Sequence, residues 1–471
     1  MVLPSRISVH PNVVRIAGSA LGLPKHALCH DKDAVPTTYT TCVHSDKHDM
    51  QMKHYMIKSW VMVDGERYCA LIARDTGLPV FYPTLYVTSQ VRNRSLSHAA
   101  MEQAHCALAV LLNFCSDASI NLEARLSEKS WLTSGECSAV RDYCQKDFRP
   151  YRNTERSTVI SISKAGKRHS DAPKKVAKHT TSTRLTHIAH FISWLANLLN
   201  QSQLDEHTAN SIRSMEKCIL ALRPSYRQRN PSLDEQRGLC KDQEKELMQI
   251  LAAKHERNPF HNEGIQTRNQ LMIVMMRHLG IRSGELLNIR IEDIDFQKNE
   301  VSIKRRADQL DDPRRRQPLV KTLARRLLVD PKLAEFIRHY IVNTRRLIPN
   351  ARKNPYLFIT HKSGPTLGAP MSRANFNAVI RSIKFSSALL RNFSSHDLRH
   401  TWNERFSEWM DSKENPESKE QQEKIRENWM GWREGSGTAS IYNRRFIRRK
   451  ALEAGLELQA SLLRTKSDIP T

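Results

Sequence analysis

The spacing of hydrophobic residues predicts two long helices in the first half of the chain. Apolar residues recur every three or four positions from about 97 to 115 and again from about 185 to 199, which is the spacing of a helix that buries one face. Ser97 is placed to cap the first helix, and a polar, lysine-rich stretch from about 152 to 180 separates the two. These features predict a helical domain over residues 93–226.

The segment before these helices has the pattern of strands. Between residues 54 and 90, β-branched and aromatic residues alternate around the turn signals Asp64-Gly65 and Asp75-Thr76-Gly77. The residues before about 53 show no sustained periodicity. We therefore expect a small N-terminal region with β-hairpins over residues 1–92.

A third domain is predicted over residues 232–471. Proline, asparagine and arginine interrupt the helical pattern from Pro224 to Pro231, which is typical of a linker. A long helix is expected from Thr267 to Gly280, where the glycine ends it, and Ser283 is placed to cap the next helix. Two strand-like pieces follow, and then a helix over about 331–347.

Composition narrows the class of protein. A chain of 471 residues has room for about three domains of roughly 150 residues, and 39% apolar with 26% charged residues is typical of a globular protein. The 74 Lys and Arg exceed the 49 Asp and Glu by 25 charges, which favours a polyanionic partner, nucleic acid first and an anionic membrane surface second. No apolar run of about 18 residues is present, so no membrane span is expected.

The cysteines indicate a reducing compartment. They number nine, an odd count, and all lie between Cys29 and Cys240, which does not resemble a disulfide framework. A zinc site could be built from one local cluster, but its spacings match no common finger pattern and a polar, histidine-rich surface segment is the alternative. The cluster comprises Cys29, His30, Cys42, His44 and His48.

Two basic residues of the last domain stand in recognisable contexts, and each alone is weak evidence. Arg282 lies at the turn between two predicted helices, in Gly280-Ile-Arg-Ser-Gly-Glu-Leu-Leu287. With Glu285 three residues later, it more often forms an ion pair at a helix start than an active site. Lys321 lies in a strand-like piece among many other basic residues, which usually marks a solvated or phosphate-facing edge.

Two further pieces follow towards the end of the chain. His396 and His400 lie four residues apart, so on a helix they would share a face and could bind a metal. Arg399 between them would repel a cation, so an arginine and a histidine facing an anion together is the alternative. Trp432 follows a Met-Gly pair, and Tyr442 lies ten residues beyond it in a basic segment where a lone tyrosine is usually a packed aromatic.

Taken together in this order, the four pieces make residues 232–458 resemble the catalytic domain of the tyrosine recombinase, or phage integrase, family. The family pattern is an arginine in G-x-R-x-x-E-L, a lysine on a β-hairpin, an H-x-L-R-H box, a His or Trp after a Leu-Gly-like pair, and a tyrosine nucleophile. The catalytic residues that the resemblance implies are Arg282, Lys321, His396, Arg399, Trp432 and Tyr442, with His400 as the second histidine of the box.

The sequence departs from the family pattern in three places. The step from Trp432 to Tyr442 is about one residue longer than usual, and the polar stretch over 403–428 is longer than in compact members. Lys304 also follows a strand-like piece and competes with Lys321 for the hairpin position. The pattern K-x-x-x-R-x-L leading into a helix favours Lys321.

The resemblance also implies a fold and an activity. The fold is multidomain and mainly α: a helical core-binding domain that clamps DNA, followed by a mixed α+β catalytic domain, after the small N-terminal β-containing region. The activity is that of a site-specific recombinase or integrase of a mobile genetic element, acting through a 3′-phosphotyrosine intermediate. The implied partners are double-stranded DNA and a homo-tetramer on paired sites, with no cofactor, metal or membrane, in the bacterial cytoplasm at the nucleoid.

The chemistry is consistent with these residue types. A tyrosine that attacks a phosphodiester conserves the bond energy for rejoining, so no ATP is required. Arg282 and Arg399 could stabilise the phosphoryl oxygens with bidentate hydrogen bonds in place of a metal. His396 is a candidate base for the tyrosine, whose pKa is about 10 when unperturbed, Lys321 is a candidate acid, and Trp432 can donate its indole N–H.

Three rival hypotheses remain open at the level of sequence. A type IB topoisomerase-like enzyme would use the same chemistry without a specific pair of sites. A catalytically silent DNA-binding protein would keep the fold alone. A metal hydrolase would use His396 and His400 with a third ligand.

Overall fold

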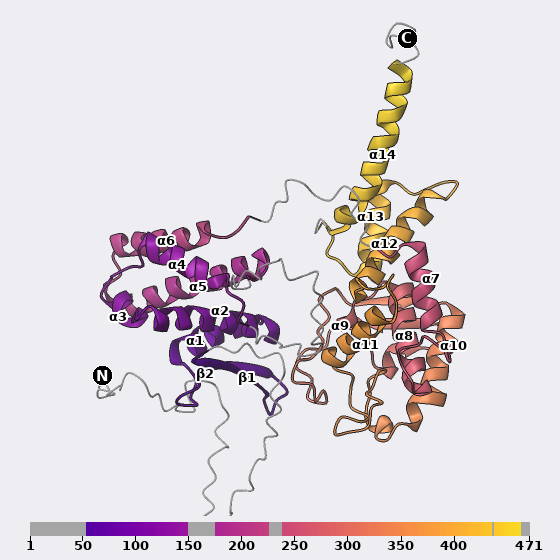
Figure 1. Cartoon of the computed structure of the whole chain (residues 1–471), viewed down its shortest axis with the longest axis horizontal. Coiled ribbons are helices and arrows are strands. Elements are labelled where there is room, and N and C mark those ends of the chain that lie inside the picture. Colours follow the sequence, from indigo (N-terminus) through magenta and orange to yellow (C-terminus); the bar gives the residue numbers. More distant parts are fainter. Residues whose placement is uncertain (1–52, 149–174, 226–237, 436–437, 463–471) are drawn as a thin grey trace, which may run out of the picture. The chain divides into compact units, whose positions relative to one another are not determined.

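The computed structural model describes residues 53–148, 175–225, 238–435 and 438–462 (Figure 1), apart from the side chains of 203 and 438–449. The described chain is mostly helical, with one two-stranded and one three-stranded sheet. Most of the linker predicted from Pro224 to Pro231, the cluster from Cys29 to His48 and most of the lysine-rich stretch lie outside the described residues. The chain separates into two compact units, Met1–Trp60 with Tyr68–Arg227, and Val61–Arg67 with Gln228–Thr471.

The first half of the described chain holds a β-hairpin and six α-helices. They are β1 (Tyr55–Val61), β2 (Arg67–Ala73), α1 (Phe81–Tyr86), α2 (His98–Asp117), α3 (Leu122–Ser127), α4 (Ser134–Cys144), α5 (Lys178–Leu199) and α6 (Glu206–Ala221). The hairpin predicted around Asp64-Gly65 and the two long helices α2 and α5 are confirmed.

The strand pattern predicted beyond residue 80 is wrong. The chain there forms α1 and then a π-helical stretch over Val87–Arg92. The buried residues Pro83, Val87 and Val91 recur every four residues, and Tyr86 lies three residues after Pro83, so they cover one helical face. A short run of β-branched and aromatic residues fits the two-residue period of a strand as well as the period of a helix. Only the packing against neighbouring helices decides between the two structures.

One hydrophobic core joins the hairpin to the helices. Cys69 and Leu71 of β2 pack in the same cluster as Leu108 of α2 and Ile188 of α5. Apart from Val61–Arg67, which belongs to the second unit, the part of the region 1–92 that the structure describes therefore shares its core with the helical domain. The cysteines in the described residues are free thiols.

The second half of the described chain contains the other three strands and eight α-helices. They are α7 (Lys241–Ile250), α8 (Glu263–Leu279), α9 (Ser283–Leu286), β3 (Ile294–Asp295), β4 (Glu300–Ile303), β5 (Arg325–Leu328), α10 (Pro331–His339), α11 (Arg373–Ser386), α12 (Ser395–Asp411), α13 (Lys419–Met430) and α14 (Thr438–Leu462). No helix among the described residues has the length and apolar composition needed to cross a membrane.

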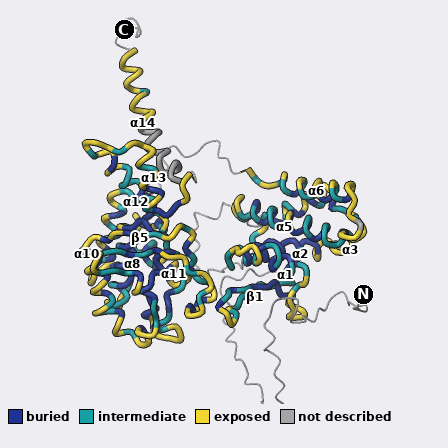
Figure 2. The backbone as a smooth tube through the Cα atoms, turned by 180° about the vertical axis from the view of Figure 1, so that it is seen from behind, coloured by how far each residue is buried: buried dark blue, intermediate teal, exposed yellow. Residues whose placement is uncertain are grey.

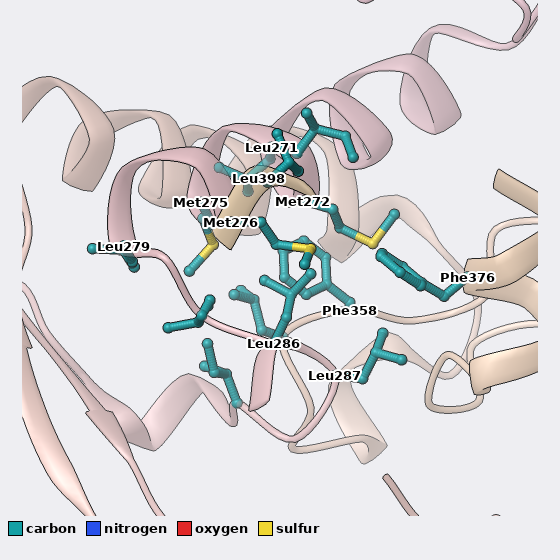
Figure 3. Packing of buried hydrophobic residues seen from close by; sticks show 14 of the residues in the cluster. Leu271, Met272, Met275, Met276, Leu279, Leu286, Leu287, Phe358, Phe376 and Leu398 are labelled. Atoms are coloured by element: carbon teal, nitrogen blue, oxygen red, sulfur yellow. The ribbon is translucent and has the colours of Figure 1, made fainter. Parts of the chain in front are cut away.

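Helix α8 forms the centre of the second core. Figure 3 shows Met272 and Met276 of α8 packed with Leu286, Phe358 and other buried side chains from later elements. Figure 2 colours each residue by its burial and shows buried residues in the interior of this unit and exposed residues on the outer faces of its helices. This core fixes the C-terminal end of α8, from which the candidate site is built.

The end of α8 requires a glycine, as predicted. Gly280 has φ +63°, in the left-handed region that glycine adopts without strain. A Cβ at this position would lie 2.7 Å from Cε of Met430. The helix that follows differs from the prediction, because α9 ends at Leu286 and its N-cap is Arg282 rather than Ser283. The Glu285 side chain accepts the Arg282 backbone N–H and so moves the start by one residue.

The three-stranded sheet is antiparallel in the order β3-β4-β5, with Val301 of β4 paired to Leu327 of β5. Lys321 lies outside this sheet, in the connection between β4 and β5, so its predicted place on a strand is wrong. A residue just after Lys321 forms its backbone hydrogen bond outside the sheet: the Leu323 N–H donates to the carbonyl of Gly431 at 2.9 Å. The chain rejoins the sheet only at Arg325.

Candidate active site

The H-x-L-R-H box forms the first two turns of α12. Ser394 and Asp397 close a capping box at the start of this helix, which satisfies its first backbone donors. The rings of His396 and His400 lie 4.5 Å apart between centroids at 85°, so the predicted shared face is confirmed. Arg399, which lies between them in the sequence, is fully buried.

Arg399 connects three segments that are far apart in sequence. Its Nη1 donates to the carbonyl of Gly280 at 2.8 Å, and its Nη2 donates to the carbonyl of Met430 at 3.3 Å. Its guanidinium carbon lies 5.3 Å from the ring centroid of Trp432, which is itself buried. The structure therefore brings Arg399 and Trp432, two of the predicted residues, into contact.

Glu285 is the buried carboxylate around which the arginines gather. Its Oε2 accepts from Nη2 of Arg325 at 3.1 Å and lies 4.0 Å from Nη1 of Arg399, and its Oε1 lies 3.6 Å from Nη1 of Arg282. Burial would raise the pKa of this carboxyl, but Arg325, the Thr322 hydroxyl and Arg399 hold it below its usual value. Glu285 is therefore an ionised anchor for three guanidiniums.

Arg282 lies at the mouth of this cluster. Its side chain is 31% exposed, and its Nη1 atom is buried with no hydrogen-bond acceptor among the described residues. The ion pair with Glu285 that the sequence suggested as an alternative is present, at 3.6 Å, and it leaves donors that can face an incoming anion.

The charges of Arg399 and Arg282 act on the His396 imidazole. Burial lowers the pKa of its imidazole, Arg399 and Arg282 lower it further, and Asp397 opposes the shift. His396 precedes Arg399 by less than one turn of α12, and Arg399 and Arg282 both lie against Glu285. The imidazole is held in its neutral form at neutral pH, as a general base requires.

The two candidate lysines occupy different surroundings. Lys321 is exposed, and the next residue, Thr322, donates its hydroxyl to Oε1 of Glu285 at 2.6 Å. Lys304 directly follows β4, and its Nζ lies 3.1 Å from Oδ1 of Asp293. The segment that carries Lys321 therefore runs along the Glu285 cluster, whereas Lys304 is engaged in an ion pair.

Tyr442 lies near the start of α14, and its side chain is outside the described residues. Helix α14 packs against α12, which carries the histidine box, and against α13, which ends at Gly431 just before Trp432. The backbone thus brings the predicted nucleophile's helix beside the helices that carry His396, Arg399 and Trp432.

A family comparison decides between the possible classes of enzyme. Residues 238–446 match the model of the phage integrase family, a range that spans every predicted site residue. Residues 238–446 of the second unit belong to the phage integrase family. The activity of this unit is therefore that of a site-specific recombinase, which cuts and rejoins DNA.

Solved structures resemble the chain only at low TM-scores. The XerA recombinase is 14% identical with a TM-score of 0.30, over 79% of this chain and 97% of its own. The XerH site-specific recombinase, bound to palindromic difH substrate, is 15% identical with a TM-score of 0.35, over 69% and 84%. The Tn1549 transposon integrase, in complex with circular intermediate DNA, is 14% identical with a TM-score of 0.30, over 55% and 79%. Curated proteins give no match.

Three residues of the integrase unit were not predicted as part of the site: Glu285, Thr322 and Arg325. Arg325 is nearly buried, and its Nε donates to the carbonyl of Trp429 at 2.6 Å while its Nη2 binds Glu285. Glu285 is part of the motif G-x-R-x-x-E-L and Arg325 is part of the motif K-x-x-x-R-x-L, so these motifs could have indicated both residues from the sequence. In the part of the chain that the structure describes, no three His, Cys, Asp or Glu side chains form a group that could hold a metal ion.

Replacing Glu285 by glutamine is expected to destabilise the integrase unit by about 3–5 kcal/mol, because buried guanidiniums would lose their counter-charge. Urea unfolding of the full chain measures the change. The matched control is Glu292→Gln, since Glu292 forms an ion pair with Arg290 and the Glu292 side chain is 63% exposed. That substitution is expected to cost no more than about 1 kcal/mol. Equal effects of the two substitutions would contradict the anchoring role of Glu285.

Proposed function

We propose that this recombinase cuts one DNA strand with Tyr442 and rejoins it through a 3′-phosphotyrosine intermediate, at a site formed by Arg282, Arg399 and His396. The observation that carries the proposal is the convergence of the Arg282 and Arg399 guanidiniums on one buried carboxylate, Glu285, together with an imidazole, His396, whose pKa both arginines lower. The packing of α14 against α12 supports Tyr442 as the nucleophile.

The reaction is a transesterification. The hydroxyl oxygen of Tyr442 attacks the phosphorus, the bond from phosphorus to the 5′-oxygen breaks, and the 3′ end becomes attached to the tyrosine. His396 takes the tyrosine proton, and Lys321 gives a proton to the departing 5′-oxygen. Arg282 and Arg399 stabilise the charge on the phosphoryl oxygens. Attack by a 5′-hydroxyl on the phosphotyrosine reverses these steps and rejoins the strand.

The indole of Trp432 is proposed to complete the anion-binding site. It lies buried against the Arg399 guanidinium, so both groups are held in place before substrate arrives. An indole N–H donates but cannot accept, which suits a phosphoryl oxygen.

The remaining parts of the chain have proposed roles in binding and assembly. The helical domain over 93–226 would clamp duplex DNA, and the excess of 25 positive charges would supply phosphate contacts. The outer part of α14 is exposed (Figure 2). Its exposed apolar side chains include Leu452, Leu456 and Leu462. A homo-tetramer on paired sites could use these leucines to join neighbouring copies at the bacterial nucleoid.

A nicked suicide substrate tests the proposed function. Full-length protein is mixed with nicked duplexes that tile the DNA on both sides of the gene. The expected product is a protein-DNA adduct that survives denaturation and carries a blocked 3′ end. Binding without an adduct would indicate a catalytically silent DNA-binding protein. Relaxation of any supercoiled plasmid without paired sites would indicate a topoisomerase-like enzyme.

The pH dependence of cleavage tests His396 as the base. Burial and the two arginines lower its pKa below the usual value of about 6.5. A base must be neutral to act, so the rate should decline as pH falls, and the midpoint of that decline should lie below pH 6.5. Single-turnover cleavage from pH 5 to 9 measures this profile, and His396→Gln should remove the decline. A decline centred above pH 6.5 would contradict the assignment.

A sulfur-substituted substrate separates Lys321 from Lys304. Lys321→Ala should slow cleavage of normal DNA by about 10²-fold or more, because general acid catalysis is lost. A substrate with sulfur in place of the bridging 5′-oxygen should restore the rate, since a thiolate leaves without a proton. Lys304→Ala, the matched control, should show neither effect. Rescue of Lys304→Ala alone would assign the acid to that residue.

A further inference from the structure

A cavity of about 260 Å³ lies within the first unit and is lined by residues from β1, α1, α3, α5 and the end of α2. Its inner wall is apolar and comes from three helices. The side chains of this wall are Leu112, Cys115, Leu122, Phe191 and Leu195. The volume lies just below the roughly 300 Å³ at which drug-sized pockets begin, which favours a small or slender ligand.

The rim of the cavity carries two tyrosines and a carboxylate. Tyr55 comes from β1, Tyr82 from α1 and Glu123 from α3. Burial raises the pKa of Tyr82, and the charge of Glu123 raises it further. The pKa of Tyr55 is also raised, first by burial and then by Asp75, Cys115 and Glu123. All three side chains line the same cavity, and Glu123 is the one carboxylate among its lining residues.

The carboxylate of Glu123 lacks a counter-charge within the described part of the chain. No Lys, Arg or His there forms an ion pair with it, although the protein carries 25 excess positive charges. The residue is exposed at the rim, yet contact with the cavity wall removes enough water to raise the pKa of its carboxyl. An anion at the mouth of an apolar cavity favours a cationic ligand.

Other ligand classes fit the cavity less well. Glu123 would repel a phosphate or a carboxylate. Burial raises the pKa of the Cys115 thiol to about 12, so this sulfur remains protonated and is a poor nucleophile or metal ligand. Two phenol rings and one carboxylate around an apolar wall are the groups that bind an organic cation by charge and by cation–π contact.

We propose that this cavity binds a primary alkylammonium group with an apolar stem. The stem would lie against Leu112, Phe191 and Leu195, and the ammonium would lie between Glu123 and the rings of Tyr55 and Tyr82. A free aliphatic amine and the side chain of a lysine in a polypeptide share this chemistry. The site is separate from the recombination chemistry of the second unit and adds a ligand-responsive element to the DNA-clamping domain.

Ligand-observed NMR titration of the full chain tests the proposal with three probes. n-Hexylammonium represents the free amine, Nα-acetyl-lysine N-methylamide represents the polypeptide, and 1-hexanol is the uncharged control. We expect either cation to bind at least tenfold more tightly than 1-hexanol. Tighter binding of the free amine would identify a small metabolite-like ligand, and tighter binding of the lysine probe would identify a polypeptide. Equal binding of all three probes would overturn the proposal.

Substitutions locate the binding. Glu123→Gln should weaken binding of the preferred cation at least tenfold, whereas Glu128→Gln, at the other end of the same helix, should leave it unchanged. Tyr82→Leu, which keeps apolar bulk and removes the ring, should weaken it severalfold and serves if the first variant fails to fold. Circular dichroism checks the fold. Unchanged affinity in folded Glu123→Gln or in folded Tyr82→Leu would overturn the proposal.

Discussion

Replacing Tyr442 by phenylalanine is expected to abolish covalent attachment to DNA and to leave DNA binding intact. Phenylalanine keeps the ring but lacks the hydroxyl oxygen that attacks the phosphorus. Denaturing gels of the nicked suicide reaction measure the adduct, and gel shifts measure binding. The expected loss of adduct is complete, which is the largest effect that the proposed chemistry predicts.

A second tyrosine of the same unit provides the control. Tyr356 donates its hydroxyl to Oδ2 of Asp312 at 3.1 Å and lies inside the core. Tyr356→Phe removes one buried hydrogen bond, worth about 1 kcal/mol, and should retain cleavage. Adduct formation by Tyr442→Phe at the wild-type rate would show that another residue is the nucleophile.

Replacing Arg399 by alanine is expected to lower the rate of cleavage by about 10²–10³-fold or more and to lower binding much less. The reason is that a positioned donor contributes most when charge develops on the phosphoryl oxygens in the transition state. Arg399 also donates to the carbonyls of Gly280 and Met430, so the variant should lose stability as well. Single-turnover rates and binding constants, measured on protein shown to be folded, separate these contributions.

Arg391→Ala is the control for Arg399→Ala, because Arg391 is exposed just before α12 and should affect binding alone. Cleavage by the wild-type protein should also persist in excess EDTA, since the two arginines take the place of a metal. Equal losses in binding and cleavage for Arg399→Ala would contradict a transition-state role. Activity that disappears in EDTA and returns with zinc or magnesium would favour a metal site at His396 and His400.

Long periodic helices with clear end signals could be predicted from the sequence. The apolar stripes of α2, α5 and α8 extend over several turns, and Gly280 marks the end of α8 by its left-handed backbone. Short segments could not be predicted in this way. The π-helical stretch Val87–Arg92 reads as a strand, because few turns are available to distinguish the two periods.

The site could be predicted as a set of residues but not as an arrangement. The motif pattern gave Arg282, His396 and Arg399 as candidates, and in the structure the two arginines lie against Glu285. Glu285 also binds Arg325, which is 40 residues away along the chain. Such a contact is set by how the β4-β5 connection packs, and no local pattern encodes it.

Mass spectrometry of the trapped protein-DNA adduct tests the central claim most directly. The adduct from the suicide substrate is digested with protease and nuclease, and the peptide that carries the remaining nucleotide is sequenced. The account predicts that the phosphodiester is attached to the hydroxyl oxygen of Tyr442 and to the 3′ end of the cut strand. Attachment at any other residue, or a 5′ linkage, would contradict it.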